Sequence, residues 1–150
     1  MANENNALLA YVYTGLLAPG VIVGDPTPML AFQAESFPTE ILLPVNFGVV
    51  GFNGVDGYSI EFKVTFDGQD VSISTVDGKL MKHHPLWGDN GEYVADMSVF
   101  EKFKAISAGY YCLEARLLFK SASKEQDWEV IDIKKSHFAV SKAWENKFHG

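Results

Sequence analysis

Apolar and polar residues alternate most regularly between residues 58 and 66. The apolar positions are Tyr58, Ile60, Phe62, Val64 and Phe66, and the residues between them are polar or charged. A period of two residues is typical of a strand that turns one face to the core and the other to solvent. Asp67-Gly68 follows directly and predicts a two-residue hairpin, because a type I′ turn needs positive φ at both central residues. With Asp77-Gly78 as a second turn of this kind, residues 58–83 are predicted to form a three-stranded antiparallel meander.

The longest pattern covers residues 107–120 and predicts the central strand of the fold. One set of alternate residues is wholly apolar and the other carries charged side chains; the apolar set is Tyr111, Leu113, Ala115, Leu117 and Phe119. Residues 41–50 also alternate, with their odd positions toward the core. Pro44, on the opposite face, marks an edge or a bulge, because proline cannot donate to a ladder. Residues 128–140 predict a last strand or a bulged pair of strands.

Residues 92–106 fit two patterns. Alternation over 92–99 predicts a strand, whereas Ser98-Val99-Phe100-Glu101 fits a helix capping box. One short helical turn within 99–106, just before the central strand, accommodates both. The chain is therefore predicted to be all-β, with about seven to nine strands and at most one helical turn.

The start of the central strand resembles the corner of immunoglobulin-type sandwiches, which carry Asp-x-Gly-x-Tyr-x-Cys at this point. Ala108-x-Tyr110-x-Cys112 keeps the cysteine but turns Glu114 and Arg116 into the core. Ser107-x-Gly109-x-Tyr111-x-Leu113 keeps the inward face apolar, and it is favoured because unpaired buried charge is far more costly than an exchange of apolar residues. The resemblance implies a disulfide-free, antiparallel immunoglobulin-like β-sandwich. It also implies that the Tyr111 hydroxyl ties the preceding loop to the strand.

Length and composition indicate one domain over residues 1–150, with residues 1–6 and 141–150 peripheral. A chain of 150 residues, 47% hydrophobic and 21% charged, is typical of a globular domain. Its single cysteine, Cys112, excludes an intramolecular disulfide. The apolar stretch 7–23 is broken by Thr14-Gly15 and Pro19-Gly20, so it indicates neither a signal peptide nor a membrane span. We expect a cytoplasmic protein that does not bind membranes.

The net charge of −7 is unevenly distributed, because residues 1–62 contain six acidic residues and no Lys or Arg. Nucleic-acid binding needs clustered cationic groups, so this chain is not expected to bind nucleic acid directly. An acidic surface that docks a basic partner is compatible with the charge.

The sequence contains no recognisable catalytic or metal-binding pattern. The glycines lie in turns between strands and form no phosphate-binding loop. His83 and His84 are adjacent, so on a strand they would point to opposite faces and could not readily share a metal. Cys112 would need a nearby base, and His137 could reach it only if the last strand pairs with the central one. We therefore expect no enzymatic activity, no cofactor and no metal.

Aromatic and apolar surface is what remains as a functional signal. The candidate binding residues are His84, Leu86, Trp87 and Tyr110. Trp87 lies between Pro85 and Gly88, where it would either cap the core or contact a partner. The sequence thus predicts a binding protein that contacts another protein through loops at one end of the sandwich or through an acidic surface. The alternatives are a carbohydrate- or small-ligand-binding module and, less favoured, a hydrolytic enzyme. Self-association through the outer sheet face, on the outward side of the central strand 107–120, is also compatible.

Overall fold

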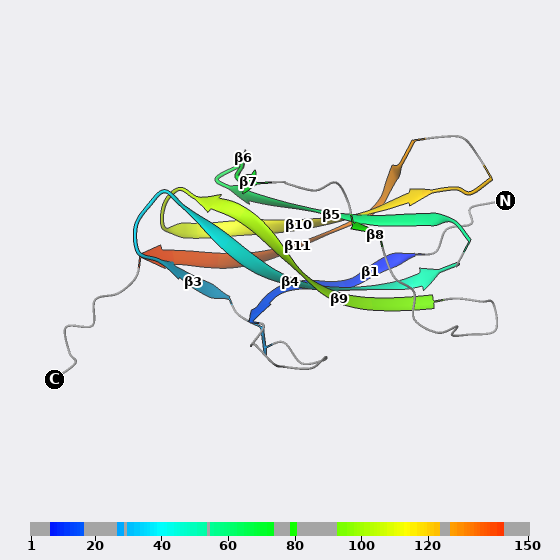
Figure 1. The fold of residues 1–150 in the computed structure, drawn as a ribbon, viewed down its shortest axis with the longest axis horizontal. Helices are drawn as coiled ribbons and strands as arrows, with labels where there is room; N and C mark the ends of the chain where they lie inside the picture. The colour runs from blue at the N-terminus through cyan, green and yellow to red at the C-terminus, as the bar shows by residue number, and fades with distance from the viewer. Residues whose placement is uncertain are drawn as a thin grey trace.

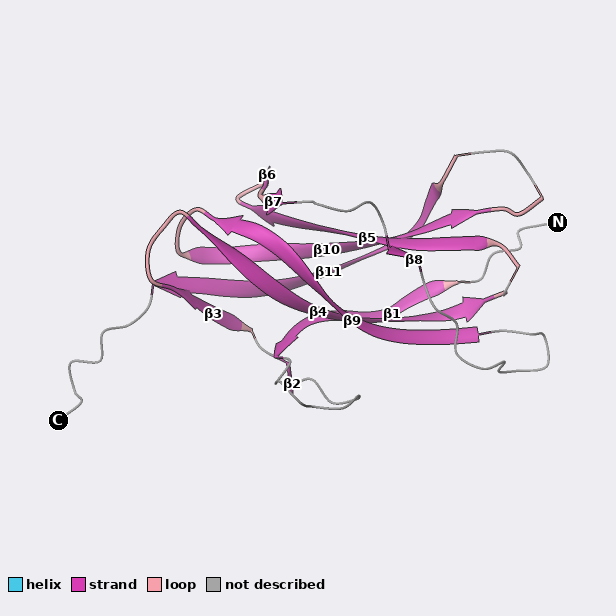
Figure 2. Ribbon diagram, in the orientation of Figure 1, coloured by secondary structure: helices cyan, strands magenta, loops and turns pink. Residues whose placement is uncertain are grey.

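The computed structural model describes residues 7–16, 27–28, 30–53, 55–73, 79–80, 93–123 and 127–142. These residues form strands and no helix (Figure 2). The strands are β1 (Leu8–Leu16), β2 (Thr27–Pro28), β3 (Ala31–Ala34), β4 (Thr39–Phe52), β5 (Gly57–Phe66), β6 (Gln69–Asp70), β7 (Ser72–Ile73), β8 (Lys79–Leu80), β9 (Tyr93–Ala105), β10 (Gly109–Lys120) and β11 (Glu129–Lys142). The prediction of an all-β fold is confirmed. Its seven longer strands lie within the expected number, and the other four are two residues long.

The strands form two sheets that pack into a β-sandwich (Figure 1). One sheet has the order β2-β1-β4-β9-β7, and the other has the order β3-β11-β10-β5-β6, with β8 also paired to β5. Every described pairing is antiparallel except that between β3 and β11, which is parallel, so one sheet is antiparallel and the other is mixed. The β9–β10 and β3–β4 turns lie at one end of the molecule, and the start of β5 and the end of β10 lie at the other.

The inward faces of the long strands make one continuous core. Its largest fully buried side chains are Tyr111, Phe47, Phe52, Phe103, Leu43, Ile60, Leu113, Leu117, Val45, Val49, Val64 and Val140. The predicted phase of β10 is confirmed, because Tyr111, Leu113, Ala115 and Leu117 are fully buried while Cys112, Glu114 and Arg116 are partly exposed. The odd positions of residues 43–49 are likewise buried.

Pro44 lies in β4, an inner strand between β1 and β9, at a point where the β4 ladder has a local edge. The β1–β4 ladder ends at the pair Thr14 and Val45, so Pro44 is one residue beyond it. Proline is tolerated here because β4 has no described neighbour on that side at this position.

The helical turn predicted within 99–106 is wrong. β9 is paired with β4 along its whole length, from Tyr93 opposite Phe52 to Ala105 opposite Thr39. Phe103 and Ala105 are fully buried in strand phase. A continuous ladder satisfies far more backbone groups than an isolated turn, so it overrides the local capping signal.

The meander is also wrong beyond its first turn. The hairpin at Asp67-Gly68 is confirmed, with φ of 53° and 80° and Phe66 paired with Gln69. After Asp70 the chain crosses between the sheets: the Val71 N–H donates to Val64 O and the Val71 carbonyl accepts from Lys104 N, both at 2.9 Å. β6 and β8 both run antiparallel to β5, so the chain does not reverse between them as a second hairpin would require. Asp77-Gly78 lies outside the described residues.

The corner before β10 is held by the Tyr111 hydroxyl. This group donates to Ser107 O at 2.6 Å and accepts from the N–H groups of Ile106 and Ser107 at 3.2 and 3.3 Å. The predicted tie between Tyr111 and the preceding loop is confirmed. The immunoglobulin-like relationship itself stays a prediction.

Candidate functional site

Of the four predicted binding residues, Tyr110 is described, while His84, Leu86 and Trp87 lie outside the described residues. Tyr110 is the second residue of β10, and its side chain is 82% exposed on the outer face of the sheet. Tyr93, the first described residue after the segment 81–92, pairs with Phe52 at the opposite end of the sandwich. Tyr110 therefore lies at the opposite end of the sandwich from the start of β9, the strand that follows the Trp87 segment.

The face that presents Tyr110 is the outer side of the β11–β10–β5 layer, which we call the β10 face. Its residues on β10 are Tyr110, Cys112, Glu114, Arg116, Leu118 and Lys120, with their cross-strand neighbours on β5 and β11. Alternation places these side chains opposite the core, and pairing on both sides keeps the strand that carries them fixed.

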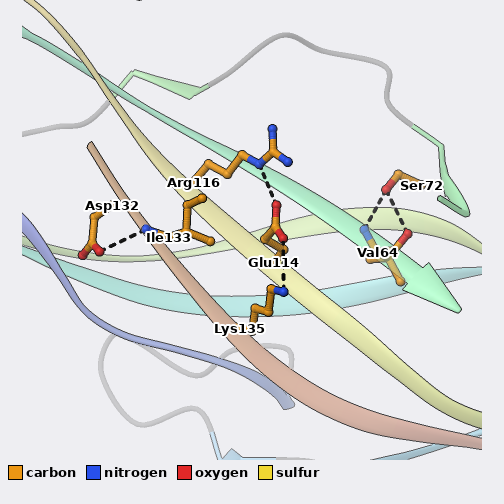
Figure 3. Close-up of polar contacts among 7 residues, drawn as sticks. All are labelled: Val64, Ser72, Glu114, Arg116, Asp132, Ile133 and Lys135. Carbon is orange, nitrogen blue, oxygen red and sulfur yellow. Dashed lines mark hydrogen bonds and ion pairs between the residues drawn. The ribbon is translucent and has the colours of Figure 1, made fainter. Parts of the chain in front are cut away.

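Glu114 is the centre of an ion-pair group on the β10 face (Figure 3). Its Oε2 accepts a hydrogen bond from Arg116 Nε at 2.6 Å, and Lys135 Nζ lies 3.9 Å from its Oε1. The Glu114 side chain is only 16% exposed, so its charge is partly withdrawn from water and is compensated by both partners. Lys63 and Glu61 are the β5 neighbours of Glu114 and Arg116. The middle of the face thus alternates in charge and is not the acidic surface suggested by the net charge.

The two ends of the β10 face carry aromatic side chains. Tyr110 lies at one end, and at the other the Trp128 ring lies against Gly57, with Lys120 Nζ 5.9 Å from its centroid. Val130 and Ile133 are also partly exposed near Trp128. At about 3.3 Å per residue, the ten steps from residue 110 to residue 120 separate the two ends by about 33 Å.

Cys112 and His137 are directly opposite each other on β10 and β11. The strand pairing that a cysteine nucleophile would require is therefore present. The two side chains do not hydrogen-bond to each other, although activation of the thiol needs that contact. Among the described residues, no three His, Cys, Asp or Glu side chains cluster in a way that could hold a metal ion.

The opposite end of the sandwich has a well-tied loop. Asn53 Oδ1 accepts from the N–H groups of Val55 and Asp56 at 2.8 and 2.9 Å, and Asp56 Oδ1 accepts from Ala122 N at 2.7 Å. These bonds fasten residues 53–56 to the turn after β10. Burial raises the pKa of Tyr58, which follows this loop, and the negative charge of Asp56 raises it further. The nearby backbone of Asn53 lowers it, although the Tyr58 hydroxyl forms no hydrogen bond with the described residues.

A second surface was missed by the sequence reasoning. On the outer side of β1, β4 and β9, which we call the β4 face, large apolar side chains are exposed. They are Leu8, Tyr11, Leu42, Val50 and Phe100, with exposed fractions between 38% and 55%. The available signal was that Leu42, Pro44 and Val50 occupy even positions of a stretch whose odd positions already filled the core.

Comparison of the chain with protein-family models, with curated proteins and with solved structures finds no match. No helix capable of crossing a membrane occurs in the part of the chain that the structure describes. The predicted cytoplasmic location stays a prediction.

Proposed function

We propose that this protein is a binding module that recognises another protein through the β10 face. The observation that carries this proposal is that Tyr110, Trp128 and Arg116, the only arginine in the chain, belong to this one face. Trp, Tyr and Arg are the residues most enriched among those that contribute strongly to protein–protein binding.

The composition of the β10 face suits a partner that binds and leaves. Alternating charges at Lys63, Glu114 and Lys135 lie between the aromatic ends. Interfaces of proteins that are also stable apart are about as polar as ordinary surface and use charge pairs for orientation and specificity. β10, the strand that carries Tyr110, Glu114 and Arg116, is paired with both β5 and β11 over almost its whole length, so little order must be gained there on binding.

The test is capture of partners from the native host, followed by affinity measurements on the captured protein. We expect Tyr110→Ala and Trp128→Ala each to weaken binding by tenfold or more, about 1.4 kcal/mol. Val55→Ala is the matched control, because Val55 is an exposed apolar residue on the loop 53–56. A loss of binding in Val55→Ala, with wild-type affinity in both aromatic variants, would assign recognition to the loop end instead. Thermal melts show whether Trp128→Ala remains folded.

Carbohydrate binding is the second candidate, and one observation favours it. The β11 neighbour of Tyr110 is the small Ala139, which leaves the Tyr110 ring open. His137 and Thr65 flank Cys112 in the next cross-strand row and could hydrogen-bond to hydroxyl groups. A glycan array that gives a signal with the wild type and none with Tyr110→Ala would favour this function over protein binding.

We also propose that the sandwich is immunoglobulin-like. The strand order supports this: with β1, β4, β5, β7, β9, β10 and β11 taken as A to G, strands A, B, E and D fall in one sheet and C, F and G in the other. The Tyr111 corner at the start of β10 is a second point of support. An experimental structure with a different order of these seven strands would contradict the proposal.

A further inference from the structure

The β4 face differs in kind from the β10 face. Large apolar side chains are exposed on three adjacent strands of one sheet, with exposed charged residues at one end of the same face. Leu8 and Val50 are paired across β1 and β4, while Leu42 and Phe100 come from β4 and β9 further along. Large apolar side chains exposed together on one sheet face of a globular protein indicate an interaction site.

The size of the β4 face suits a small, reversible interface. β4 has 14 residues and is paired with β9 along almost all of its length. At about 3.3 Å per residue β4 extends about 46 Å, and the two strands, about 4.8 Å apart, cover about 10 Å. The resulting area of about 450 Å² is below the roughly 800 Å² that each partner contributes to a standard interface, as expected for a reversible dimer. A twisted sheet is matched best by another sheet, as in the interior of a sandwich.

The charges on the β4 face are self-complementary. At one end, Glu40 on β4 lies beside Lys102 and Lys104 on β9, and Glu40 is directly opposite Lys104. A two-fold axis that runs along the strands, between β4 and β9, would bring β4 of each copy over β9 of the other. Glu40 of one copy would then meet the two lysines of the second, twice over, as the symmetry of such a dimer requires. The Glu40–Lys102 pair within the chain, at 3.9 Å, is largely exposed and weak, so both side chains remain available to pair with a second copy.

We propose that a second copy of this chain covers the β4 face, forming a two-fold homodimer with β4 of each copy over β9 of the other. The same rotation places Leu42 of one copy near Phe100 of the other and covers both side chains, whereas Leu8 and Tyr11 of β1 lie outside the overlap. The arrangement is independent of the function proposed above. It leaves a β10 face outward on each side of the dimer, so each copy can bind a partner.

The first test is the mass of the full chain in solution by light scattering after size exclusion. We expect twice 16.6 kDa for the wild type at tens of micromolar, and 16.6 kDa for Leu42→Glu and for Phe100→Glu. Both residues are about half exposed, so the melting temperature of the variants should stay close to that of the wild type. Tyr110→Glu, on the β10 face, is the control and should remain dimeric. A wild type that is monomeric throughout, or equal dissociation of the Tyr110→Glu control, overturns the proposal.

The second test exchanges charges and checks the direction of the axis. One variant carries Glu40→Lys, and the other carries both Lys102→Glu and Lys104→Glu. Each variant by itself should dimerise about tenfold more weakly than the wild type at about 50 mM salt. A mixture of these two variant chains should form a heterodimer with near wild-type affinity, because each strand then meets opposite charge on its partner. Unchanged dimerisation of either variant, or a mixture no tighter than the variants alone, would overturn this arrangement. If the wild type is monomeric and Leu42→Glu loses a partner captured by the wild type, the face belongs to that other protein and the homodimer is excluded.

Discussion

At the residue scale, the Tyr111 hydroxyl does more than any other single polar group to fix the turn between β9 and β10. It satisfies three backbone groups of Ile106 and Ser107. Tyr111→Phe keeps the ring in the core but leaves those groups without their partner. We expect a loss of about 1–3 kcal/mol in the free energy of unfolding, measured by urea denaturation.

The neighbouring residue gives the matched control. Tyr110→Phe removes the same atom from a ring that is almost wholly in water. Its effect should stay within about 0.5 kcal/mol. Equal effects of the two substitutions would mean that the corner is held by packing of the Tyr111 ring and not by its hydroxyl.

The same two tyrosines show what the sequence could predict about single residues. Their phase followed from a comparison of two registers, one of which buries Glu114 and Arg116. The free-energy cost of burying unpaired charge far exceeds the difference between burying Cys112 and burying Leu113, so only the register with Tyr111 inward was favourable. No comparable energetic penalty predicted that Trp128 lies on the surface, because aromatic residues occur both in cores and on surfaces.

At the element scale, two glycines with positive φ shape the ends of β5 and β10. Gly68 has a φ of 80° in the β5–β6 hairpin, and an added Cβ would meet nothing within 4 Å. Gly109 has a φ of 150° at the start of β10, and its Cβ would lie 2.8 Å from the Phe66 ring, which stacks on Tyr111. We expect Gly68→Ala to cost about 1 kcal/mol from backbone strain alone.

Gly109→Ala should cost about 2–4 kcal/mol, because displacement of the Phe66 ring adds to the backbone strain. Urea denaturation of both variants provides the comparison. A smaller cost at Gly109 than at Gly68 would show that Phe66 moves aside freely and that its stacking on Tyr111 contributes little.

Elements were predicted well where local chemistry determines them and poorly where distant pairing does. Asp67-Gly68 needs only its own backbone conformation to form a turn, and it was found. The route of the chain after Asp70 depends on Val71, whose backbone bonds to both Val64 and Lys104. A period of two residues reports that one side of a strand is apolar, but not which sheet it joins. The capping box at residues 98–101 failed for the same reason, since the partner that overrides it is β4.

At the scale of the whole molecule, the sandwich itself could be predicted from the sequence, but the assignment of each strand to one of its two sheets could not. Leu42 and Phe100 occupy outward positions of strands that are more than fifty residues apart, and only the β4–β9 pairing brings them together. The parallel pair β3–β11 was likewise invisible, because β3 has four residues and a weak pattern. On the β10 face, the outward position of Tyr110 could be predicted, because its strand is long and alternates strictly between apolar and polar residues.

The sandwich is closed on one side by a contact between sheets that a substitution can test. Asp132 of β11 accepts the Leu9 N–H of β1 on Oδ2 at 2.8 Å. Its Oδ1 accepts the Ile133 N–H at 3.0 Å (Figure 3). These strands belong to different sheets, so the carboxylate takes the place of a ladder bond between them.

Asp132→Ala should lower the free energy of unfolding by about 1–3 kcal/mol, because it leaves the partly buried Leu9 N–H without an acceptor. Amide hydrogen exchange at Leu9 should accelerate at the same time, since the edge of β1 is no longer held. Asp132→Asn keeps an oxygen acceptor and should lose less than Asp132→Ala. Asp127→Ala removes an exposed carboxylate just before β11 and serves as the control, with an expected change within about 0.5 kcal/mol. If Asp132→Ala matches this control and Leu9 exchange is unchanged, the two sheets are held together at this edge by side-chain packing alone.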